Sequence, residues 1–210
     1  MIKYINFHED IRTIKKDTKI EFKNQITVIT GDNGSGKSTI LHSILTKLSP
    51  EGKVPFSMNT TVGKDIQKDT IQLLGKKGLS IEDIVYIDSV SGLLKNLSYF
   101  DDNLMDIQLA SMHQSSGEGL LLQLANISKE ENLNEKILIL DEPERGLSIK
   151  QQFTVAKYLG YLAKENEGLQ IIVVSHGYGI LTSFTEVYST NTFEYTKSID
   201  YISSMIQESL

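Results

Sequence analysis

A glycine-rich loop near the N-terminus carries the clearest chemical signal in this sequence. Residues 31–39 read GDNGSGKST, and the pattern G-x-x-x-x-G-K-[ST] is matched by Gly31, Gly36, Lys37 and Ser38. Glycines let successive backbone N–H groups turn inward on a phosphate chain, and a helix that starts inside the loop adds about half a positive charge. The lysine can reach phosphate oxygens, and the serine hydroxyl can occupy one position on an octahedral Mg²⁺. The loop therefore predicts a site for phosphates and Mg²⁺.

The loop by itself does not define a reaction. Kinases, GTPases, helicases and transport-type ATPases all use this motif, so other residues must separate them. The loop does define the residues that would surround the phosphates, because a strand precedes it and a helix follows. These residues are Gly31, Asp32, Asn33, Gly34, Ser35, Gly36, Lys37, Ser38 and Thr39.

Two carboxylates end an apolar run further along the chain. The segment ILILDEPE spans residues 137–144, and its apolar residues predict a buried strand that stops at Asp141. Asp141 is suited to hold Mg²⁺ through water, and Glu142 to accept a proton from a water in line with the γ-phosphate. Such a pair is often only a solvated strand end, but the phosphate loop in the same chain favours the catalytic interpretation.

A histidine follows another apolar run, residues 171–174. His176 lies 35 residues past Asp141, where a contact to the γ-phosphate would be needed. A lone histidine at a strand end is commonly structural. In this chain we expect His176 to act in catalysis together with Lys37 and Glu142.

The stretch HQSSGEG, residues 113–119, separates the alternatives. A serine hydroxyl, the N–H groups around Gly117 and a helix N-terminus would form a second anion site. Ser115 stands 26 residues before Asp141. In this order and spacing, the chain resembles the ATP-binding-cassette (ABC) ATPases, whose signature has the form L-S-G-G-Q/E.

The resemblance extends from Ile20 to His176 and implies ATP and Mg²⁺ as cofactors. In that family, the signature of one subunit closes over the γ-phosphate held by the loop of the other, so a head-to-tail homodimer is implied. The implied reaction is Mg²⁺-dependent hydrolysis of ATP to ADP and phosphate. The implied signature residues are Ser115, Ser116, Gly117 and Glu118.

Finer features are similar to the RecF/SMC-like, non-transport branch of the family, which includes defence-associated ATPases. DEPERGL has Glu144 after the proline, where transport subunits usually show DEPT, and SSGE stands in place of SGGQ. The coiled coil of SMC proteins is missing. The glutamine that family members place before the helical lobe is not evident, and Asp88 or Ser89 stands there. Candidates for contact with adenine are Tyr4, Phe7 and Arg12.

Three uses of the ATP cycle stay open. The first is DNA repair, recombination or phage defence, in which closure of the dimer switches a DNA or effector-protein partner. The second is the ATPase subunit of an ABC transporter, which DEPE disfavours. The third is a slow-turnover switch that holds ATP and binds a partner protein.

The elements that must position these residues predict an α/β fold. Apolar runs predict strands at 1–7, 19–23, 25–30, 84–88, 137–140, 171–174 and 184–188. Helical spacing predicts helices from 37 to a stop at Pro50 and at 93–112, 118–127, 150–165 and 199–206, and we expect a strand pair with one helix within 51–83. The prediction is a single ABC-type P-loop domain over 1–210, with a mixed or parallel sheet flanked by helices, an antiparallel strand portion and an inserted helical lobe at about 89–127.

Composition narrows the cellular compartment and the kinds of partner that this chain can have. The 210 residues include no cysteine, so disulfides and thiolate chemistry are excluded and a cytoplasmic location is expected. Charges near the N-terminus and the short apolar runs predict neither a signal peptide nor insertion into a membrane. A net charge of -6 argues against a surface that coats nucleic acid broadly.

Overall fold

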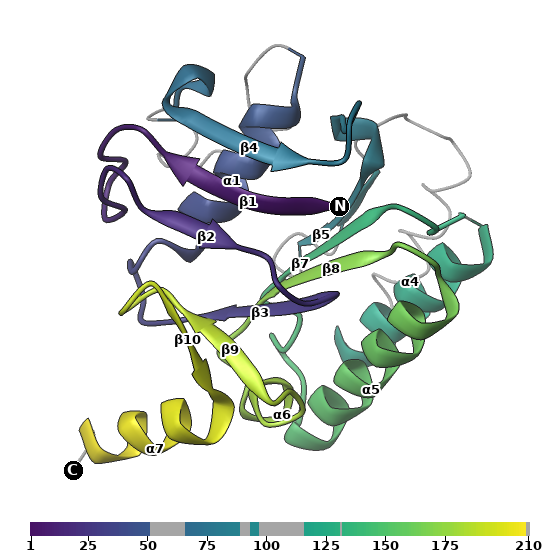
Figure 1. The fold of residues 1–210 in the computed structure, drawn as a ribbon. Helices are drawn as coiled ribbons and strands as arrows, with labels where there is room; N and C mark the ends of the chain where they lie inside the picture. The colour runs from purple at the N-terminus through teal and green to yellow at the C-terminus, as the bar shows by residue number, and fades with distance from the viewer. Residues whose placement is uncertain (51–65, 89–92, 97–115, 131, 209–210) are drawn as a thin grey trace.

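The structure is a computed structural model that describes residues 1–50, 66–88, 93–96, 116–130 and 132–208 (Figure 1). The strands are β1 (Ile2–Phe7), β2 (Lys19–Glu21), β3 (Ile26–Thr30), β4 (Ile71–Gly75), β5 (Ile84–Asp88), β6 (Leu93–Asn96), β7 (Ile137–Asp141), β8 (Gln170–Val174), β9 (Glu186–Ser189) and β10 (Glu194–Lys197). The α-helices are α1 (Lys37–Leu48), α4 (Ser116–Glu130), α5 (Ile149–Glu165), α6 (Tyr178–Leu181) and α7 (Ser198–Glu208), and two 3₁₀ turns are η1 (Lys68–Thr70) and η2 (Ile81–Asp83).

Seven strands form the central sheet, in the order β10-β9-β3-β8-β7-β5-β6. The strands from β9 to β5 run parallel, and β10 and β6 pair antiparallel at the two ends of the sheet. Parallel neighbours require long crossover connections, and α5 forms the one between β7 and β8. The predicted α/β fold with a mixed sheet is confirmed. We call the edge where the parallel strands end the carboxyl edge, and the opposite one the amino edge.

Strands β7 and β8 are buried on both faces, which explains their unbroken apolar sequences. Ile137 and Ile139 pack into one hydrophobic core, whereas Leu138 and Leu140 pack into the other. The residues of β8 from Ile171 to Val174 alternate in the same way. Because successive side chains of a strand point to opposite faces, a continuous apolar run indicates a strand that is covered on both sides.

One of these cores encloses α1. The small antiparallel sheet, in the order β2-β1-β4, packs over α1, and α1 in turn packs on the central sheet (Figure 1). Each aliphatic side chain buried there stabilises the fold by about 2 kcal/mol. This core includes Ile5, Phe7 and Ile71 of the small sheet, Ile40, Leu41, Ile44 and Leu45 of α1, and Ile29, Ile139 and Ile172 of the central sheet.

The other core lies between the opposite face of the central sheet and helices α4, α5, α6 and α7. Figure 1 shows α4 and α5 alongside each other on this face. Helix α5 begins at a capping box, in which the Ser148 hydroxyl accepts the Gln151 N–H and the Gln151 side chain accepts the Ser148 N–H. This cap sets where the turn after β7 ends.

One prediction differs from the structure. Residues 93–96, expected to begin a helix, form strand β6, which pairs with β5 from Asp88↔Leu93 to Val85↔Asn96. A short apolar run cannot distinguish a helix from a strand, and the open edge of β5 supplies the backbone partners. Of residues 51–83, the structure describes 66–83, which hold β4 and two 3₁₀ turns. Residues 51–65 lie outside the described residues, so the helix and second strand predicted within 51–83 stay predictions. Residues 89–92 and 97–115 of the predicted lobe also lie outside the described residues.

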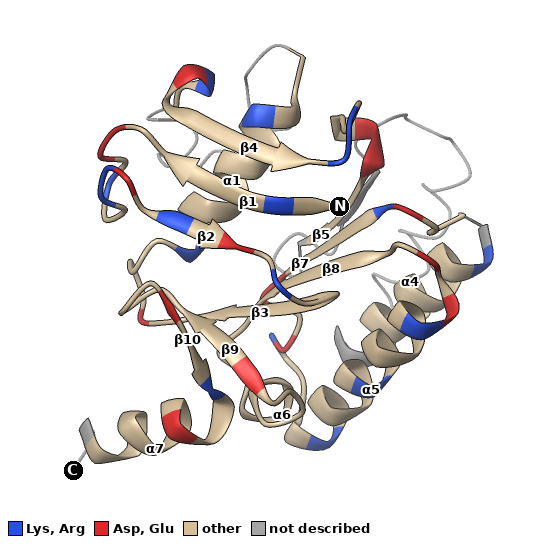
Figure 2. Cartoon of the chain, viewed as in Figure 1, with Lys and Arg blue, Asp and Glu red and all other residues tan. Residues whose placement is uncertain are grey.

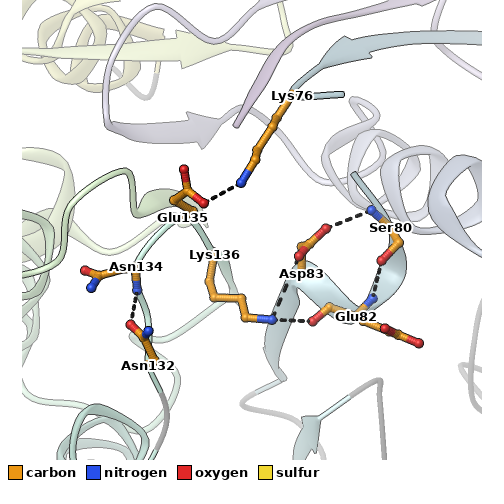
Figure 3. Close-up of polar contacts among 8 residues, drawn as sticks. All are labelled: Lys76, Ser80, Glu82, Asp83, Asn132, Asn134, Glu135 and Lys136. Carbon is orange, nitrogen blue, oxygen red and sulfur yellow. Dashed lines mark hydrogen bonds and ion pairs between the residues drawn. The ribbon is translucent and has the colours of Figure 1, made fainter. Parts of the chain in front are cut away.

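The amino edge is closed by paired charges (Figure 3). The Lys136 ammonium donates to the Glu82 carbonyl at 2.8 Å and lies 3.9 Å from the Asp83 carboxylate. Asp83 also accepts the Ser80 N–H at 2.9 Å, which caps η2. Lys76, just past β4, pairs with Glu135, just before β7. The Lys76–Glu135 pair joins the small sheet to the central sheet.

Over the described ranges, no helix combines the length and the apolar character that crossing a membrane requires.

Candidate functional site

The sheet register brings the predicted chemical residues to one edge. Ile29 of β3 pairs with Val174 of β8, and Val174 pairs with Asp141 of β7. These three strands therefore end in one row across the sheet. Asp141 lies in that row, and the phosphate loop, Glu142 and His176 follow it, so the strand ends collect these residues at the carboxyl edge.

The phosphate loop is shaped by glycines and opens a helix. Gly31, Gly34 and Gly36 have φ values of 145°, 83° and 113°, which side-chain-bearing residues rarely adopt. Gly36 is the N-cap of α1, and this described helix has neither a side-chain cap nor an acidic residue in its first turn. Its N-terminal N–H groups are thus available to an anion, as a phosphate site requires.

The turn after β9 braces this loop from the far side. Asn191 Oδ1 accepts the Asp32 N–H at 2.9 Å, and the hydroxyls of Thr190 and Ser35 lie 2.5 Å apart. A Cβ added at Gly31 would stand 2.1 Å from Thr190 Oγ1, so only glycine fits there. The loop's shape therefore depends on residues about 160 positions away in sequence.

Lys37 is a buried cation at the centre of the loop, with 6% of its surface exposed. Its ammonium donates to the carbonyls of Gly31 at 2.9 Å and Asp32 at 2.7 Å. Burial lowers the pKa of Lys37 below its ordinary value, and the negative charges of Glu142 and Asp32 oppose part of that shift. Neutral carbonyls compensate a buried charge only partly, so an incoming anion would be favoured here.

The acidic pair lies in a constrained turn at the end of β7. Asp141 accepts a hydrogen bond of 3.1 Å from the hydroxyl of Tyr86, which is 1% exposed. Glu142 has φ 50°, a strained value for a residue with a side chain, and its N–H donates to Val174 O at 2.9 Å. The Glu142 carboxylate lies 3.9 Å from Arg145, and 37% of its side chain is exposed. Water can therefore reach it.

His176 is half-buried beside this turn. Its Nε2 is buried and has no hydrogen-bond partner among the described residues. Burial lowers the pKa of His176, the Lys37 charge lowers it further, and Glu144 and Glu142 oppose the shift. The lowered pKa favours the neutral imidazole, whose buried Nε2 lacks a hydrogen-bond partner within the described part of the chain.

The loop that carries His176 is held by Glu144. The Ser175 hydroxyl donates to Glu144 Oε2 at 2.8 Å, and the His176 N–H donates to Glu144 Oε1 at 2.5 Å. In the sequence, Glu144 indicated a branch of the family and no role in the site.

Other predicted residues have different outcomes. Ser115 and Ser89 lie outside the described residues, whereas Ser116, Gly117 and Glu118 belong to the first turn of α4. The last residue of β5, Asp88, pairs with Asp141 across the sheet. Of the three candidates for contact with adenine, Phe7 is fully buried in the core and is therefore not available to a ligand. The Lys19 ammonium lies over the ring of Tyr4, and Arg12 is exposed.

Sequence reasoning missed four residues that shape this site: Tyr86, Glu144, Thr190 and Asn191. The only local signal was Glu144, which stands in the DEPE motif. The other three lie on or just after strands, and only the order of strands in the sheet brings them to the loop and the acidic turn.

A phosphate loop, an acidic strand end and a histidine at one edge of a parallel sheet define a P-loop nucleotide-binding domain. The small antiparallel sheet packed over α1 gives it the fold of the ATP-binding cassettes. The chain belongs to the AAA domain family, which matches residues 7–208.

Solved structures similar to this fold include an SMC head and an ATPase of an ABC transporter complex. An SMC head bound to the C-winged helix domain of ScpA has a TM-score of 0.62 at 14% identity, covering 90% of this chain and 94% of that one. CbiO1 from Clostridium perfringens, part of an ABC transporter complex, has a TM-score of 0.57 at 17% identity, covering 90% and 84%. At such identities the likeness shows the fold.

Sequence relatives are ABC ATP-binding proteins. The zinc import ATP-binding protein ZnuC of Acinetobacter baylyi is 29% identical over 177 residues, which cover 82% of this chain. The match spans 65% of that relative, and the same share of ZnuC from Haemophilus influenzae.

Proposed function

We propose that this chain binds ATP with Mg²⁺ and hydrolyses it to ADP and phosphate, as one half of an ATP-gated head-to-tail dimer. The observation that carries the proposal is the gathering of Lys37, Glu142 and His176 just past the ends of three neighbouring strands, β3, β7 and β8. The charge of Glu142 acts on both Lys37 and His176, where it opposes the lowering of their pKa by burial. Family membership supports the same conclusion.

The loop would bind the triphosphate. The uncapped N–H groups of α1 would donate to phosphate oxygens, and the Lys37 ammonium would exchange the Gly31 and Asp32 carbonyls for the β and γ oxygens. This exchange gives a buried cation an anionic partner, so binding would be favoured by the same burial that lowers its pKa. The residues from Gly31 to Thr39 would form the cradle.

Glu142 would accept the proton of the attacking water. The water oxygen attacks the γ-phosphorus, the bond from that phosphorus to the β–γ bridging oxygen breaks, and the water's proton passes to the carboxylate. Glu142 suits this role because its carboxylate is reachable by water and held in a strained turn. Nε2 of His176, which has no partner in the described ranges, would contact the γ-phosphate.

The residues present fit a magnesium ion. In the described part of the chain, no three acidic or histidine side chains form a cluster that could hold a metal. A site with one or two protein ligands, completed by nucleotide oxygens and water, is what Mg²⁺ prefers. Ser38 and Asp141 would hold the ion, which would supply charge neutralisation at the phosphates.

The second anion site would come from a partner copy. Ser115, Ser116, Gly117 and Glu118 would close over the γ-phosphate held by the other subunit, by analogy with the family signature. Closure would be stabilised by ATP and released by hydrolysis.

Phosphate release with MgATP tests the central claim. We expect steady turnover by the wild-type protein, in proportion to its concentration. Release no greater than that of Lys37→Ala, purified identically, would contradict the proposal. The Lys37→Ala protein also controls for contaminating ATPases, because it is purified in the same way and lacks the ammonium that would contact the phosphates.

We propose DNA repair, recombination or phage defence as the use of the cycle, with a DNA or effector-protein partner. The fold shared with an SMC head supports this use, and so does Glu144 in the DEPE motif. Acidic and basic segments are interspersed over the described chain (Figure 2), which favours a local contact over a broad DNA groove. Turnover should rise when DNA or the effector is added.

A second candidate is the ATPase subunit of a transporter, favoured by the ABC ATP-binding relatives. It predicts co-purification with a membrane protein of several spans and no response of turnover to DNA. A third is a slow switch that holds ATP as a binding module. Near-zero turnover with tight, reversible ATP binding would favour it over the other two.

A further inference from the structure

A third carboxylate, Glu144, follows the acidic pair and reaches across to the next strand end. Its two oxygens receive different donors: Oε2 the Ser175 hydroxyl at 2.8 Å, and Oε1 the His176 N–H at 2.5 Å. Hydrogen bonds to an ionised acceptor are the strong ones in proteins. Glu144 therefore ties the turn after β7 to the loop after β8.

Both oxygens of Glu144 are occupied, which separates it from Glu142 in chemistry. A carboxylate engaged by a backbone N–H and a buried hydroxyl is poorly placed to accept a proton from water. Ser175 is 0% exposed, and its oxygen also accepts the Gly177 N–H at 3.0 Å. The contact is thus a closed network around the backbone that carries His176.

The close approach of the two segments depends on glycine. A Cβ added at Gly177 would lie 2.7 Å from Glu144 Cβ and 2.8 Å from Gln152 Oε1. Gln152, on α5, accepts the Gly179 N–H at 2.9 Å and donates to Leu147 O at 3.3 Å. The side-chain amide of Gln152 therefore holds the same loop at a second point, at Gly179.

We infer that Glu144 is a positioning residue for His176, holding its backbone at a fixed place beside the acidic turn. The inference rests on the proposed function. His176 acts through its ring, so a shift of its backbone displaces the group that meets the γ-phosphate. A misplacement of about 1 Å can reduce a rate roughly a hundredfold.

Two conservative variants separate position from charge. Glu144→Gln keeps the length of the side chain, so its oxygen can accept the His176 N–H and its amide can donate to Ser175 Oγ. Glu144→Asp keeps the charge but is one methylene shorter, so it cannot span both donors. Glu165→Gln, at an exposed carboxylate on α5, is the matched control for a change of charge.

We expect kcat to fall about tenfold to a hundredfold in Glu144→Asp, with KM for ATP within about threefold of the wild type. Glu144→Gln should keep kcat within about threefold, like the control. Glu144→Gln as impaired as Glu144→Asp, or more so, would show that charge matters and would overturn the inference. Wild-type rates in both variants would overturn it as well.

Hydrogen exchange without nucleotide provides a readout that does not depend on activity. The His176 amide should exchange at least about tenfold faster in Glu144→Asp than in the wild type, and at the wild-type rate in Glu144→Gln. Equal exchange in all three proteins would contradict the positioning role of Glu144, even if their turnover rates differ. Absence of turnover in the wild type would contradict the proposed function. The exchange measurement would still test whether Glu144 holds the backbone of His176.

Discussion

Lys37 at the carboxyl edge and Lys136 at the amino edge are both lysines in loops or helix ends beside the same sheet, yet their surroundings differ. Lys136 lies near a carboxylate and a carbonyl, with 30% of its side chain exposed. Lys37 is 6% exposed and donates to two neutral carbonyls, and burial lowers its pKa. Lys136 has a carboxylate as its counter-charge within the fold, whereas Lys37 is placed to receive an anionic ligand.

The same contrast holds for other groups at the two edges. At the amino edge, a capping box at η2 and the Lys76–Glu135 pair satisfy local rules of structure. Positive φ occurs at both edges, at Glu135 and at Glu142, so backbone strain does not separate them. At the carboxyl edge, His176 Nε2 is buried without a partner among the described residues. Proteins retain such unsatisfied groups mainly where function requires them. The difference assigns structure to one edge and chemistry to the other.

The largest expected effect comes from Glu142→Gln, which alters the carboxyl edge without altering volume. We expect kcat to fall about a thousandfold, since general-base catalysis typically contributes 10²–10⁴, while ATP affinity is retained. An ATP-bound dimer should accumulate in size-exclusion chromatography with MgATP. A variant that stays monomeric at saturating ATP would count against the composite site.

Lys37→Ala should have the next largest effect. Loss of two charge-assisted contacts of about 1.5 kcal/mol each corresponds to roughly a hundredfold weaker ATP binding. The stability of the nucleotide-free protein should be retained or increased, since a buried cation is removed. Isothermal titration and urea unfolding measure both, and Lys164→Ala, exposed on α5, is the control. A large loss of stability would break the comparison between the two edges.

Lys136→Met tests the opposite edge. We expect the free energy of unfolding to fall by about 1 kcal/mol, because a hydrogen bond and a partly exposed ion pair are lost, with ATP affinity unchanged. Lys77→Met, at an exposed neighbouring loop position, should change neither quantity. A tenfold change in ATP affinity in Lys136→Met would mean that the amino edge also serves the site.

The smallest effect concerns pH. The pKa of His176 is lowered in the folded protein from the ordinary 6.5. At a pH between the folded and the unfolded pKa, the unfolded chain therefore binds more protons than the folded protein. The free energy of unfolding should therefore fall as the pH drops below about 6.5, and the contribution is intact above it. Urea titrations of wild type and His176→Asn across that window should show a shallower slope in the variant. Identical slopes would show that the fold does not disfavour the charged imidazole.

Local patterns predicted much of this molecule. The phosphate loop, the acidic pair and His176 stand in short motifs next to apolar runs, and the strands were found because continuous branched residues indicate burial on both faces. Strand β6 was mistaken for a helix, since four residues cannot define a period. Strand β10 was missed because it also has only four residues.

What the sequence by itself determined is therefore the set of reactive groups and the elements that carry them, because these depend on residues within a few positions of one another. Only the tertiary structure decided how those groups are held. Glu144 meets Ser175 and His176, and Asn191 meets the loop at Asp32, across separations of 31, 32 and 159 residues. Such contacts follow from the order of strands in the sheet, and hydrophobic periodicity carries no information about that order.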